Sequence, residues 1–181
     1  MNGAAHSDQG GPDLFLISAK ESLALLPAGA PALDLACGAG RHAVWLAQQG
    51  FRVTAVDSST QALAQARLLA KHRGVALDCR QLDLESPALD LGRDAYDLIC
   101  GFFFLYRPLF PILREALRPG GLIVYKTYSV DQLQHSHGPR NPAHLLEPNE
   151  LLRLLGGFRI LSYVEKWAPA ATAAIIARKP A

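Results

Sequence analysis

The sequence of 181 residues has few cysteines, no long hydrophobic run and no excess of charge of one sign. Its three cysteines, Cys37, Cys79 and Cys100, are scattered and contain neither a CxxC pair nor an even disulfide set. We therefore expect a reduced, cytoplasmic protein. Lys and Arg together number 18 against 16 Asp and Glu, a balance too even for an electrostatic nucleic-acid binder.

The apolar segments are too short to cross a membrane, since the run from Leu98 is interrupted at Arg107 and Pro108. The first 11 residues lack the basic and apolar regions of a signal peptide, so we expect neither a membrane span nor a leader. Half of the residues are apolar, which predicts a globular protein. We expect residues 1–12 to be a disordered N-terminal segment and residues 13–181 to form a single domain.

Apolar segments alternate with helix-like segments along the chain. This alternation predicts an α/β fold: a doubly wound, mostly parallel seven-stranded sheet with an antiparallel C-terminal hairpin. Ligands of such sheets bind beyond the carboxyl ends of the strands. The strands are expected at residues 32–36, 52–56, 75–80, 96–101, 122–127, 158–164 and 172–179, and the helices at 41–49, 62–71 (with a Ser58 and Gln61 capping box), 108–117 and 148–155.

A glycine-containing loop, residues 34–40 (DLACGAG), joins the first strand to the first helix. Its glycines let the backbone approach a ligand closely, and the helix that follows offers free N–H groups. Asp57 ends the second strand, where a carboxylate can accept hydrogen bonds from two ribose hydroxyls. Together these features predict an adenosine-containing ligand. Two alternatives remain. The loop also fits the nicotinamide-binding fingerprint GxGxxA or a simple tight turn. Asp57 can instead be an acid before Ser58 that interacts favourably with the dipole of the following helix.

Two further residues are candidates for contact with this ligand. Asp83 follows the third strand and can accept from an adenine amino group, with Leu82 or Leu84 against the ring; a solvated loop acid is the alternative. Arg41 opens a helix, where its charge opposes the dipole by ~0.3–1 kcal/mol. Because such exceptions are frequent at functional sites, we predict that Arg41 faces a carboxylate of the ligand, the alternative being an arginine that points into water.

These segments occur in order with residues 96–100 (YDLIC) and 118–122 (RPGGL). The chain thereby resembles class I S-adenosylmethionine-dependent methyltransferases from about Leu14 to Lys179. Residues 104–110 (FLYRPLF), 125–128 (YKTY) and 138–151 are similar to the small tellurite-resistance-type methyltransferases. Two features depart from these patterns: Ala36 stands where the family signature has its first glycine, and the final turn, residues 165–169, lacks the His and Arg expected of a tellurite-methylating enzyme.

The resemblance implies a Rossmann-like fold with S-adenosylmethionine as cofactor. The glycine loop would hold the methionine part, Asp57 the ribose and Asp83 the adenine, and strand four would end beside the sulfonium. The cofactor-binding residues implied are Asp34, Ala36, Cys37, Gly38, Gly40, Arg41, Asp57, Ser58, Asp83, Leu84 and Gly101.

Candidates for the acceptor side lie in the second half of the chain. Basic residues together with Tyr128 would attract an anion at the mouth of the site, and the histidines lie in a long loop, residues 128–145, that we expect to form a lid. The catalytic candidates are Tyr106, Arg107, Lys126, His135, His137 and Arg140. We expect no metal, because His135, His137 and His144 lack a Cys or acidic partner at tetrahedral spacing. Phe102, Phe103, Phe104 and Tyr106 at the fourth strand suggest an aromatic wall, although strand alternation favours Phe102 and Phe104 as core residues.

The resulting prediction is an enzyme that transfers a methyl group in line to a small molecule, an anion being one option, without a nucleic-acid or membrane partner. A nucleic-acid or protein methyltransferase, a nicotinamide oxidoreductase and a non-catalytic S-adenosylmethionine-binding protein are the alternatives. Residues 101–104 (GFFF) replace the Asn/Asp-Pro-Pro of base amino-group methyltransferases, and Cys100 has no neighbouring proline. The turn at residues 119–121 argues against an oxidoreductase, and no sequence feature excludes a binding-only protein.

Overall fold

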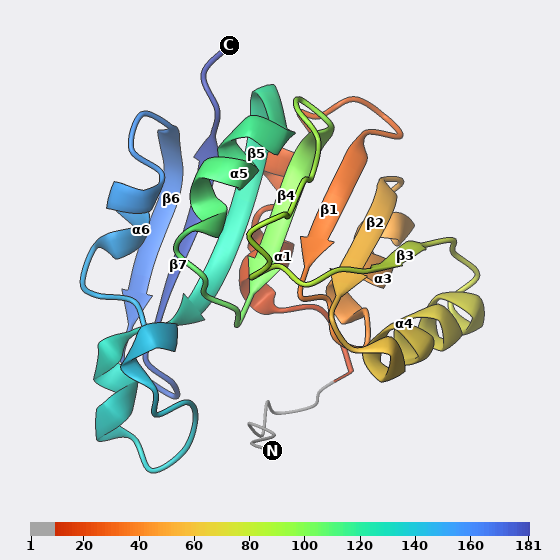
Figure 1. The fold of residues 1–181 in the computed structure, drawn as a ribbon. Helices are drawn as coiled ribbons and strands as arrows, with labels where there is room; N and C mark the ends of the chain where they lie inside the picture. Colours follow the sequence, from red (N-terminus) through yellow and green to blue (C-terminus); the bar gives the residue numbers. More distant parts are fainter. Residues whose placement is uncertain (1–9) are drawn as a thin grey trace.

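The computed structural model describes residues 10–181 (Figure 1). Residues 1–9 lie outside the described part, so the expected disordered segment at residues 1–12 and the domain boundary that follows it stay predictions. A twisted sheet forms the centre of the molecule, with helices on both faces (Figure 1). In the described part of the chain, no helix is both long and apolar enough to pass through a membrane.

The seven strands lie in the order β3-β2-β1-β4-β5-β7-β6. The first five strands pair in parallel, whereas β7 is antiparallel to both β5 and β6. The predicted doubly wound sheet with an antiparallel C-terminal hairpin is therefore confirmed. The strands are β1 (Pro31–Leu35), β2 (Arg52–Asp57), β3 (Asp78–Gln81), β4 (Tyr96–Phe102), β5 (Leu117–Tyr128), β6 (Arg159–Lys166) and β7 (Thr172–Arg178).

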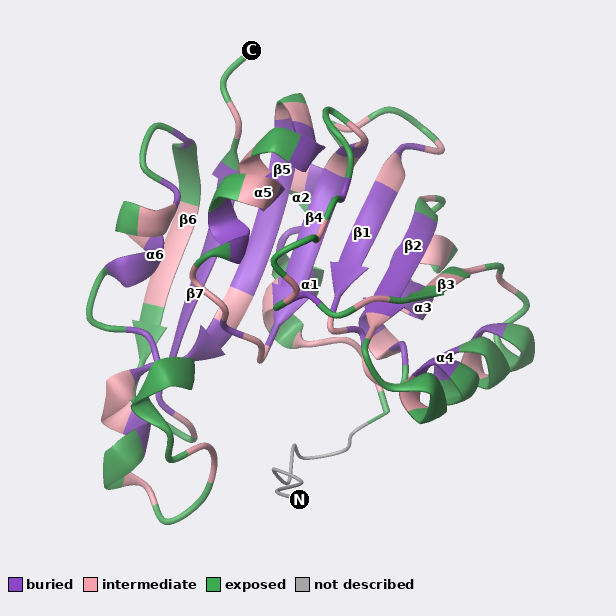
Figure 2. Ribbon diagram, viewed as in Figure 1, coloured by how far each residue is buried: buried purple, intermediate pink, exposed green. Residues whose placement is uncertain are grey.

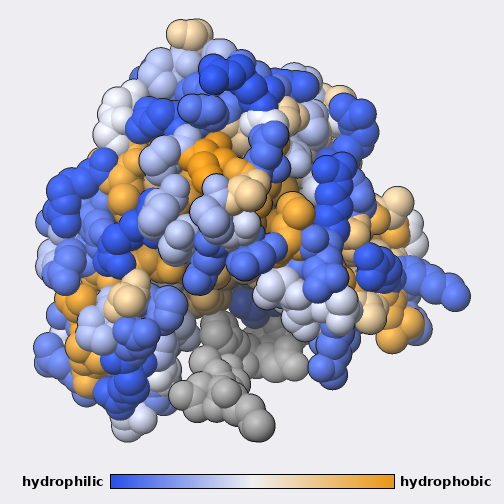
Figure 3. Space-filling model, viewed as in Figure 1, coloured by the Kyte–Doolittle hydropathy of each residue, from blue (hydrophilic) through white to orange (hydrophobic). Residues whose placement is uncertain are grey.

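Two hydrophobic clusters hold the helices against the sheet, because successive side chains of a strand point to opposite faces. Leu33 and Leu35 of β1 join the cluster under α5 (Leu109–Ala116) and α6 (Glu150–Leu154). Ala32 joins the other cluster, under α1 (Leu14–Ser18), α2 (Lys20–Leu23), α3 (Arg41–Gln48) and α4 (Thr60–His72). Figure 2 shows the central strands buried, whereas the outer sides of the helices are exposed. Hydrophilic residues cover most of the face seen in Figure 3.

Several local predictions differ from the structure. The capping box is wrong: Ser59, not Ser58, is the N-cap of α4, and its hydroxyl accepts from Ala62 N at 3.2 Å. Strand β5 begins at Leu117, five residues before the predicted start, because its first residues pair with the start of β4. Helices α1 and α2 were not expected, since neither is long enough to show helical periodicity.

The carboxyl ends of β1 to β5 meet at one edge of the sheet, the lower edge in Figure 1. The loops that leave this edge begin at residues 36, 58, 82, 103 and 129. The last of them, residues 129–149, contains two short 3₁₀ helices, Val130–Gln134 and Pro142–His144. Every candidate site residue from the sequence lies on β1, β2, β4 or β5, or on one of the segments that follow this edge.

Candidate functional site

The loop after β1 contains three residues with left-handed backbone: Ala36 (φ 48°), Gly38 (φ 54°) and Gly40 (φ 82°). A Cβ at Gly40 would lie 2.7 Å from the Cβ of Ala66, so glycine here lets the loop approach α4 closely. A Cβ at Gly38 would meet no atom within 4 Å. Gly40 is therefore needed for packing, whereas Gly38 leaves open space above its backbone that a ligand can occupy.

Ala36, which stands where the family signature has a glycine, has left-handed backbone. An L-residue in this region costs about 1–2 kcal/mol relative to the right-handed region. Its side chain packs against the cluster under α5 and α6, which supplies contacts that a glycine lacks. The loop thus accommodates a methyl group at this position by packing it against the core.

Asp57, at the end of β2, is hydrogen-bonded to the glycine loop. Its Oδ2 accepts from Gly38 N at 2.9 Å, and its Oδ1 accepts from Ser59 N at 2.9 Å. Each carboxylate oxygen has a second lone pair, which leaves capacity for hydroxyl donors. The structure therefore brings Gly38 and Asp57 together. Ser58 itself is exposed, and its carbonyl accepts from Gln81 Nε2 at 3.1 Å.

Asp34 is a buried acid on the side of β1 that faces α3, two residues from Ala32 on the same face. Neither carboxylate oxygen has a hydrogen-bond partner, which is costly for a buried polar group. Burial raises the pKa of Asp34 to about 7, while the charge of Arg41 acts to lower it. Burial also raises the pKa of the neighbouring Cys37 thiol. An unpaired buried carboxylate at this place suits a ligand that carries a cationic group.

On the adenine side, the structure separates the residues that the sequence grouped together. Asp83 is exposed, and its Oδ1 accepts from Glu85 N at 2.9 Å in a local turn. Leu84 is buried in the cluster under α5 and α6, so its side chain serves the core. Leu82 is partly buried, so of these two leucines it is the one whose side chain can still contact an adenine ring.

Gly101, expected beside the sulfonium, has a packing role. A Cβ there would lie 2.3 Å from the ring of Tyr125, the residue of β5 that pairs with Gly101. Tyr125 in turn donates its hydroxyl proton to the carbonyl of Phe104 at 2.7 Å, which fixes the turn after β4. Phe102 is buried as predicted and stacks on His42 with centroids 4.2 Å apart. Phe104 is partly buried against the core.

Phe103, one of the aromatic residues that the sequence places at the end of the fourth strand, is the centre of a cluster, and its left-handed backbone (φ 58°) turns it out of the strand alternation. The Arg41 guanidinium carbon lies 6.0 Å and the Lys126 ammonium 5.5 Å from its ring centroid. The Tyr128 ring lies 5.2 Å away. Burial raises the pKa of Tyr128 although Arg41 acts to lower it, so the phenol stays protonated at neutral pH. This Phe103 cluster presents cationic and hydrogen-donating groups around one aromatic ring.

Lys126 is also ion-paired with a residue that the sequence gave no role. Its ammonium donates to Asp13 Oδ2 at 2.8 Å and to Oδ1 at 3.0 Å. Asp13 precedes α1, and an acid before an apolar helical run was the available signal. The five-residue helix is too short for that signal to stand out.

Arg107 and Arg140 were expected at the mouth of the site, but their hydrogen bonds fasten the loop at residues 129–149. Arg107 forms two hydrogen bonds to Glu150, at 2.6 and 2.9 Å, and donates to the carbonyls of Ala143 and Leu145. Arg140 donates to the carbonyls of Leu133 and His135. The structure thus shows both guanidinium groups hydrogen-bonded within the protein, and their expected role toward an acceptor stays a prediction.

The remaining acceptor candidates lie at the rim of the same region. Tyr106 is partly buried against the core cluster. The His135 ring lies 5.8 Å from that of His137 and 5.4 Å from that of Trp167, so His135 joins the 129–149 loop to the turn between β6 and β7. Within residues 10–181, no group of three His, Cys, Asp or Glu side chains is arranged to hold a metal ion.

The residues at the first crossover fit S-adenosylmethionine. The open backbone at Gly38 accommodates a ligand, the Asp57 carboxylate has acceptor capacity for ribose hydroxyls, and Asp34 supplies an unpaired buried negative charge. Arg41 lies at the N-terminus of α3 beside this loop, where a ligand carboxylate would also meet free backbone N–H groups.

A family model described as "Methyltransferase domain" matches residues 32–121. The ubiquinone biosynthesis O-methyltransferase of Idiomarina loihiensis is 27% identical over 145 residues, which are 70% of this chain and 59% of that protein. The chain thus spans less than two thirds of this curated relative. TehB from Haemophilus influenzae superposes with a TM-score of 0.73 at 18% identity, covering 90% of this chain and 61% of that one.

The S-adenosylmethionine-dependent methyltransferase from Mesorhizobium loti superposes with a TM-score of 0.70 at 22% identity. This match covers 90% of the present chain and 98% of that one, so the two folds agree over nearly their whole length. The family match and the strand order agree with these superpositions: the chain contains a methyltransferase domain at residues 32–121 and has the fold of the class I S-adenosylmethionine-dependent methyltransferases.

Proposed function

We propose that the protein methylates a small anionic molecule with S-adenosylmethionine, holding the acceptor at the Phe103 cluster. The observation that carries this proposal is the Lys126 ammonium, which lies 5.5 Å from the centroid of the Phe103 ring and is ion-paired with Asp13, at a ring that the Arg41 guanidinium also approaches to 6.0 Å. A group of donors beside an aromatic ring suits an acceptor with an anionic oxygen or sulfur.

S-adenosylmethionine supplies a methyl group on a sulfonium, which is already an activated leaving group. The protein's task is then to align the acceptor and exclude water, and orientation of this kind is worth ~7–11 kcal/mol. Gly38 and Asp57 would fix the cofactor, while Phe103 forms one wall for the acceptor. The 129–149 loop, fastened by Arg107, would limit the access of water.

An anionic acceptor also needs no proton removed before it attacks. Asp13, the carboxylate beside Lys126, already accepts hydrogen bonds from that ammonium and from Phe15 N. The relative named as an O-methyltransferase of ubiquinone biosynthesis supports a small molecule with an oxygen nucleophile. A phenolate and an inorganic oxyanion both satisfy this chemistry.

The test is release of S-adenosylhomocysteine from S-adenosylmethionine in the presence of matched acceptors: a phenolate, a thiolate, tellurite and a neutral amine. We expect turnover with one or more of the anions and none with the amine. Lys126→Met should raise KM for the anion about 10-fold, equivalent to the loss of one charged hydrogen bond, and leave S-adenosylhomocysteine affinity within about 2-fold.

Each arm of this experiment can contradict the proposal. Turnover of the amine alone would reject an anionic acceptor. Binding of S-adenosylhomocysteine without turnover of any acceptor would favour the binding-only alternative. Absence of binding heat with both S-adenosylmethionine and S-adenosylhomocysteine would reject the cofactor site itself.

A further inference from the structure

The ion pair between Asp13 and Lys126 joins two parts of the chain that are 113 residues apart. The side chains are 11% and 19% exposed, so the pair is largely withdrawn from water. Burial of this degree reduces screening and makes the geometry of the pair matter more than that of a surface ion pair. The ion pair of Arg93 with Glu115, by contrast, is far more exposed.

Two independent interactions orient the Asp13 carboxylate. Its Oδ1 accepts from Phe15 N at 2.8 Å and so caps the first turn of α1, while the Asp13 carbonyl accepts from Ile17 N at 3.1 Å. Leu16, on the same turn, is completely buried in the cluster under α1 to α4. The capped and packed turn therefore fixes the direction from which the carboxylate approaches Lys126.

Lys126 needs such an external support because a lysine side chain is flexible and its ammonium favours water. The backbone of Lys126 is held by β5 and by Phe103 N, which donates to its carbonyl at 2.8 Å. The ammonium, however, lies beside the Phe103 ring only through its contacts to Asp13 and that ring. Of its three protons, at least one remains for another acceptor.

We propose that Asp13 is a positioning residue: it holds the Lys126 ammonium beside Phe103 and thereby sets where the anionic group of the acceptor binds. The ammonium is shared between Asp13 and the acceptor, which favours acceptors with one negative charge over those with several. The part that concerns the acceptor rests on the proposed function, whereas the placement of Lys126 can be tested without any acceptor.

The first experiment measures the reactivity of Lys126 toward an acetylating N-hydroxysuccinimide ester at low conversion, by peptide mass spectrometry. Lys71 and Lys166, both exposed, serve as internal references. Asp13→Asn retains an N-cap oxygen and removes the charge. We expect Lys126 to react about 10-fold faster in this variant, as expected for the loss of one charged contact. Glu21→Gln, an exposed acid in the first turn of α2, is the matched control and should leave the rate unchanged.

The second experiment measures kcat and KM for the anionic acceptor identified by turnover. Asp13→Asn should raise KM more than it lowers kcat, and Asp13→Asn in the Lys126→Met background should add little, because both changes remove one interaction. S-adenosylhomocysteine affinity, measured by calorimetry, should stay within about 2-fold and shows that the variant is folded.

Unchanged Lys126 reactivity in Asp13→Asn would overturn the positioning role. So would additive effects of the two substitutions on KM, since they would show that Asp13 acts elsewhere. If no acceptor is ever methylated, the proposed function fails, and the acetylation experiment still decides whether Asp13 holds Lys126.

Discussion

The two halves of the carboxyl edge are built in different ways. In the cofactor half, backbone N–H groups of neighbouring loops meet one carboxylate, as Gly38 and Ser59 meet Asp57. In the acceptor half, side chains bind residues that are distant in the sequence: Arg107 is hydrogen-bonded to Ala143 and Glu150, which follow it by 36 and 43 positions. The first kind of site depends on local loop conformation and strand order, the second on long-range packing. Substitutions should therefore affect the two halves in different ways.

The largest effect should come from the two glycines of the cofactor half. Gly40→Ala places a Cβ 2.7 Å from that of Ala66 in left-handed backbone, so we expect a loss of about 3 kcal/mol of unfolding free energy, with cofactor binding lost as the loop shifts. Gly38→Ala meets no neighbouring atom and should cost only ~1 kcal/mol of stability. It should nevertheless weaken S-adenosylhomocysteine binding by about 10-fold or more, because the methyl group fills the ligand space.

Urea unfolding and calorimetry separate these two outcomes. The comparison fails if Gly38→Ala binds S-adenosylhomocysteine as tightly as the wild type, since the open space would then not belong to the cofactor.

The acceptor half should respond mainly in stability. The Glu150 side chain is only 10% exposed and is ion-paired with Arg107. Glu150→Gln breaks this ion pair and should lower the free energy of unfolding by about 2–3 kcal/mol. Burial acts to raise the pKa of Glu150, but the hydrogen bonds from Arg107 and Glu147 N outweigh it, so the folded pKa lies below the ordinary value of 4.5.

This contribution is present above pH 4.5 and is lost as the pH falls through the lower folded pKa. Urea unfolding between pH 3 and 8 should show a steeper acid loss in the wild type than in Glu150→Gln. Glu147→Gln, an exposed acid in the same loop, is the control. Equal acid slopes in the wild type and Glu150→Gln would contradict the role of the ion pair.

Asp34→Asn should improve stability and impair binding. The folded pKa of Asp34, about 7, lies above its ordinary value of 3.8, so the stability that it contributes is fully present below pH 3.8 and is lost as the pH rises through 7. At pH 8, we expect the variant to be ~1–2 kcal/mol more stable than the wild type, because the amide removes a buried charge but is itself unpaired.

The same change should weaken S-adenosylhomocysteine binding by about 10-fold at pH 8, since the buried charge is gone. Parallel unfolding and calorimetry series at pH 5 and 8 measure both effects. A stability difference that does not grow with pH would contradict the raised pKa.

The sequence predicts the part of the site that follows from strand order. Gly38 and Asp57 meet because β1 and β2 pair in parallel and their ends share one edge. Gly101 was assigned to the ligand, and its real neighbour, Tyr125, depends on the β4–β5 register. The short α1 gave no periodic signal, so its Asp13 was missed. Arg107 was assigned to the acceptor, because a positive charge in a sequence does not reveal which acid will pair with it.

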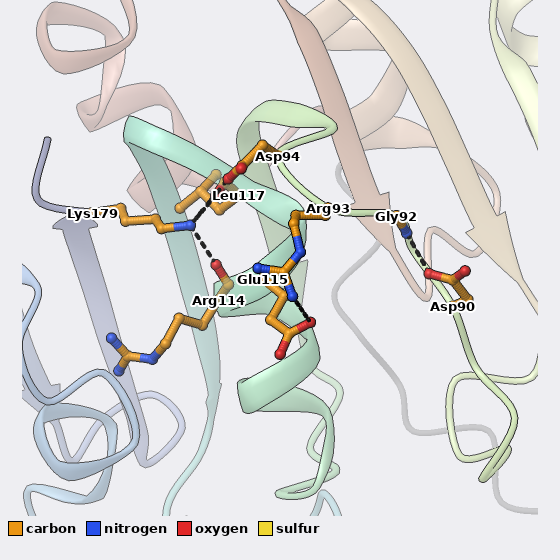
Figure 4. Close-up of polar contacts among 8 residues, drawn as sticks. All are labelled: Asp90, Gly92, Arg93, Asp94, Arg114, Glu115, Leu117 and Lys179. Atoms are coloured by element: carbon orange, nitrogen blue, oxygen red, sulfur yellow. Dashed lines mark hydrogen bonds and ion pairs between the residues drawn. The ribbon is translucent and has the colours of Figure 1, made fainter.

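The smallest effect should come from the opposite edge of the sheet, which serves as a control for both halves (Figure 4). There, Lys179 donates to the carbonyl of Arg114 at 2.8 Å and to that of Leu117, and it lies 3.3 Å from Asp94. These contacts close the last turn of α5, where a cation satisfies free carbonyls. Lys179→Met should therefore cost about 1 kcal/mol and lower Tm by a few degrees.

S-adenosylhomocysteine affinity and acceptor KM should both stay within about 2-fold in Lys179→Met, because nothing in this edge contacts the site. Arg93→Gln, which removes a surface ion pair to Glu115 at 3.5 Å, should not change stability measurably. If Lys179→Met weakened cofactor binding in proportion to its loss of stability, global destabilisation would explain the binding losses at Gly38 as well. If it leaves binding intact, a loss at Gly38 is local, and the difference between the two halves reflects how each is built.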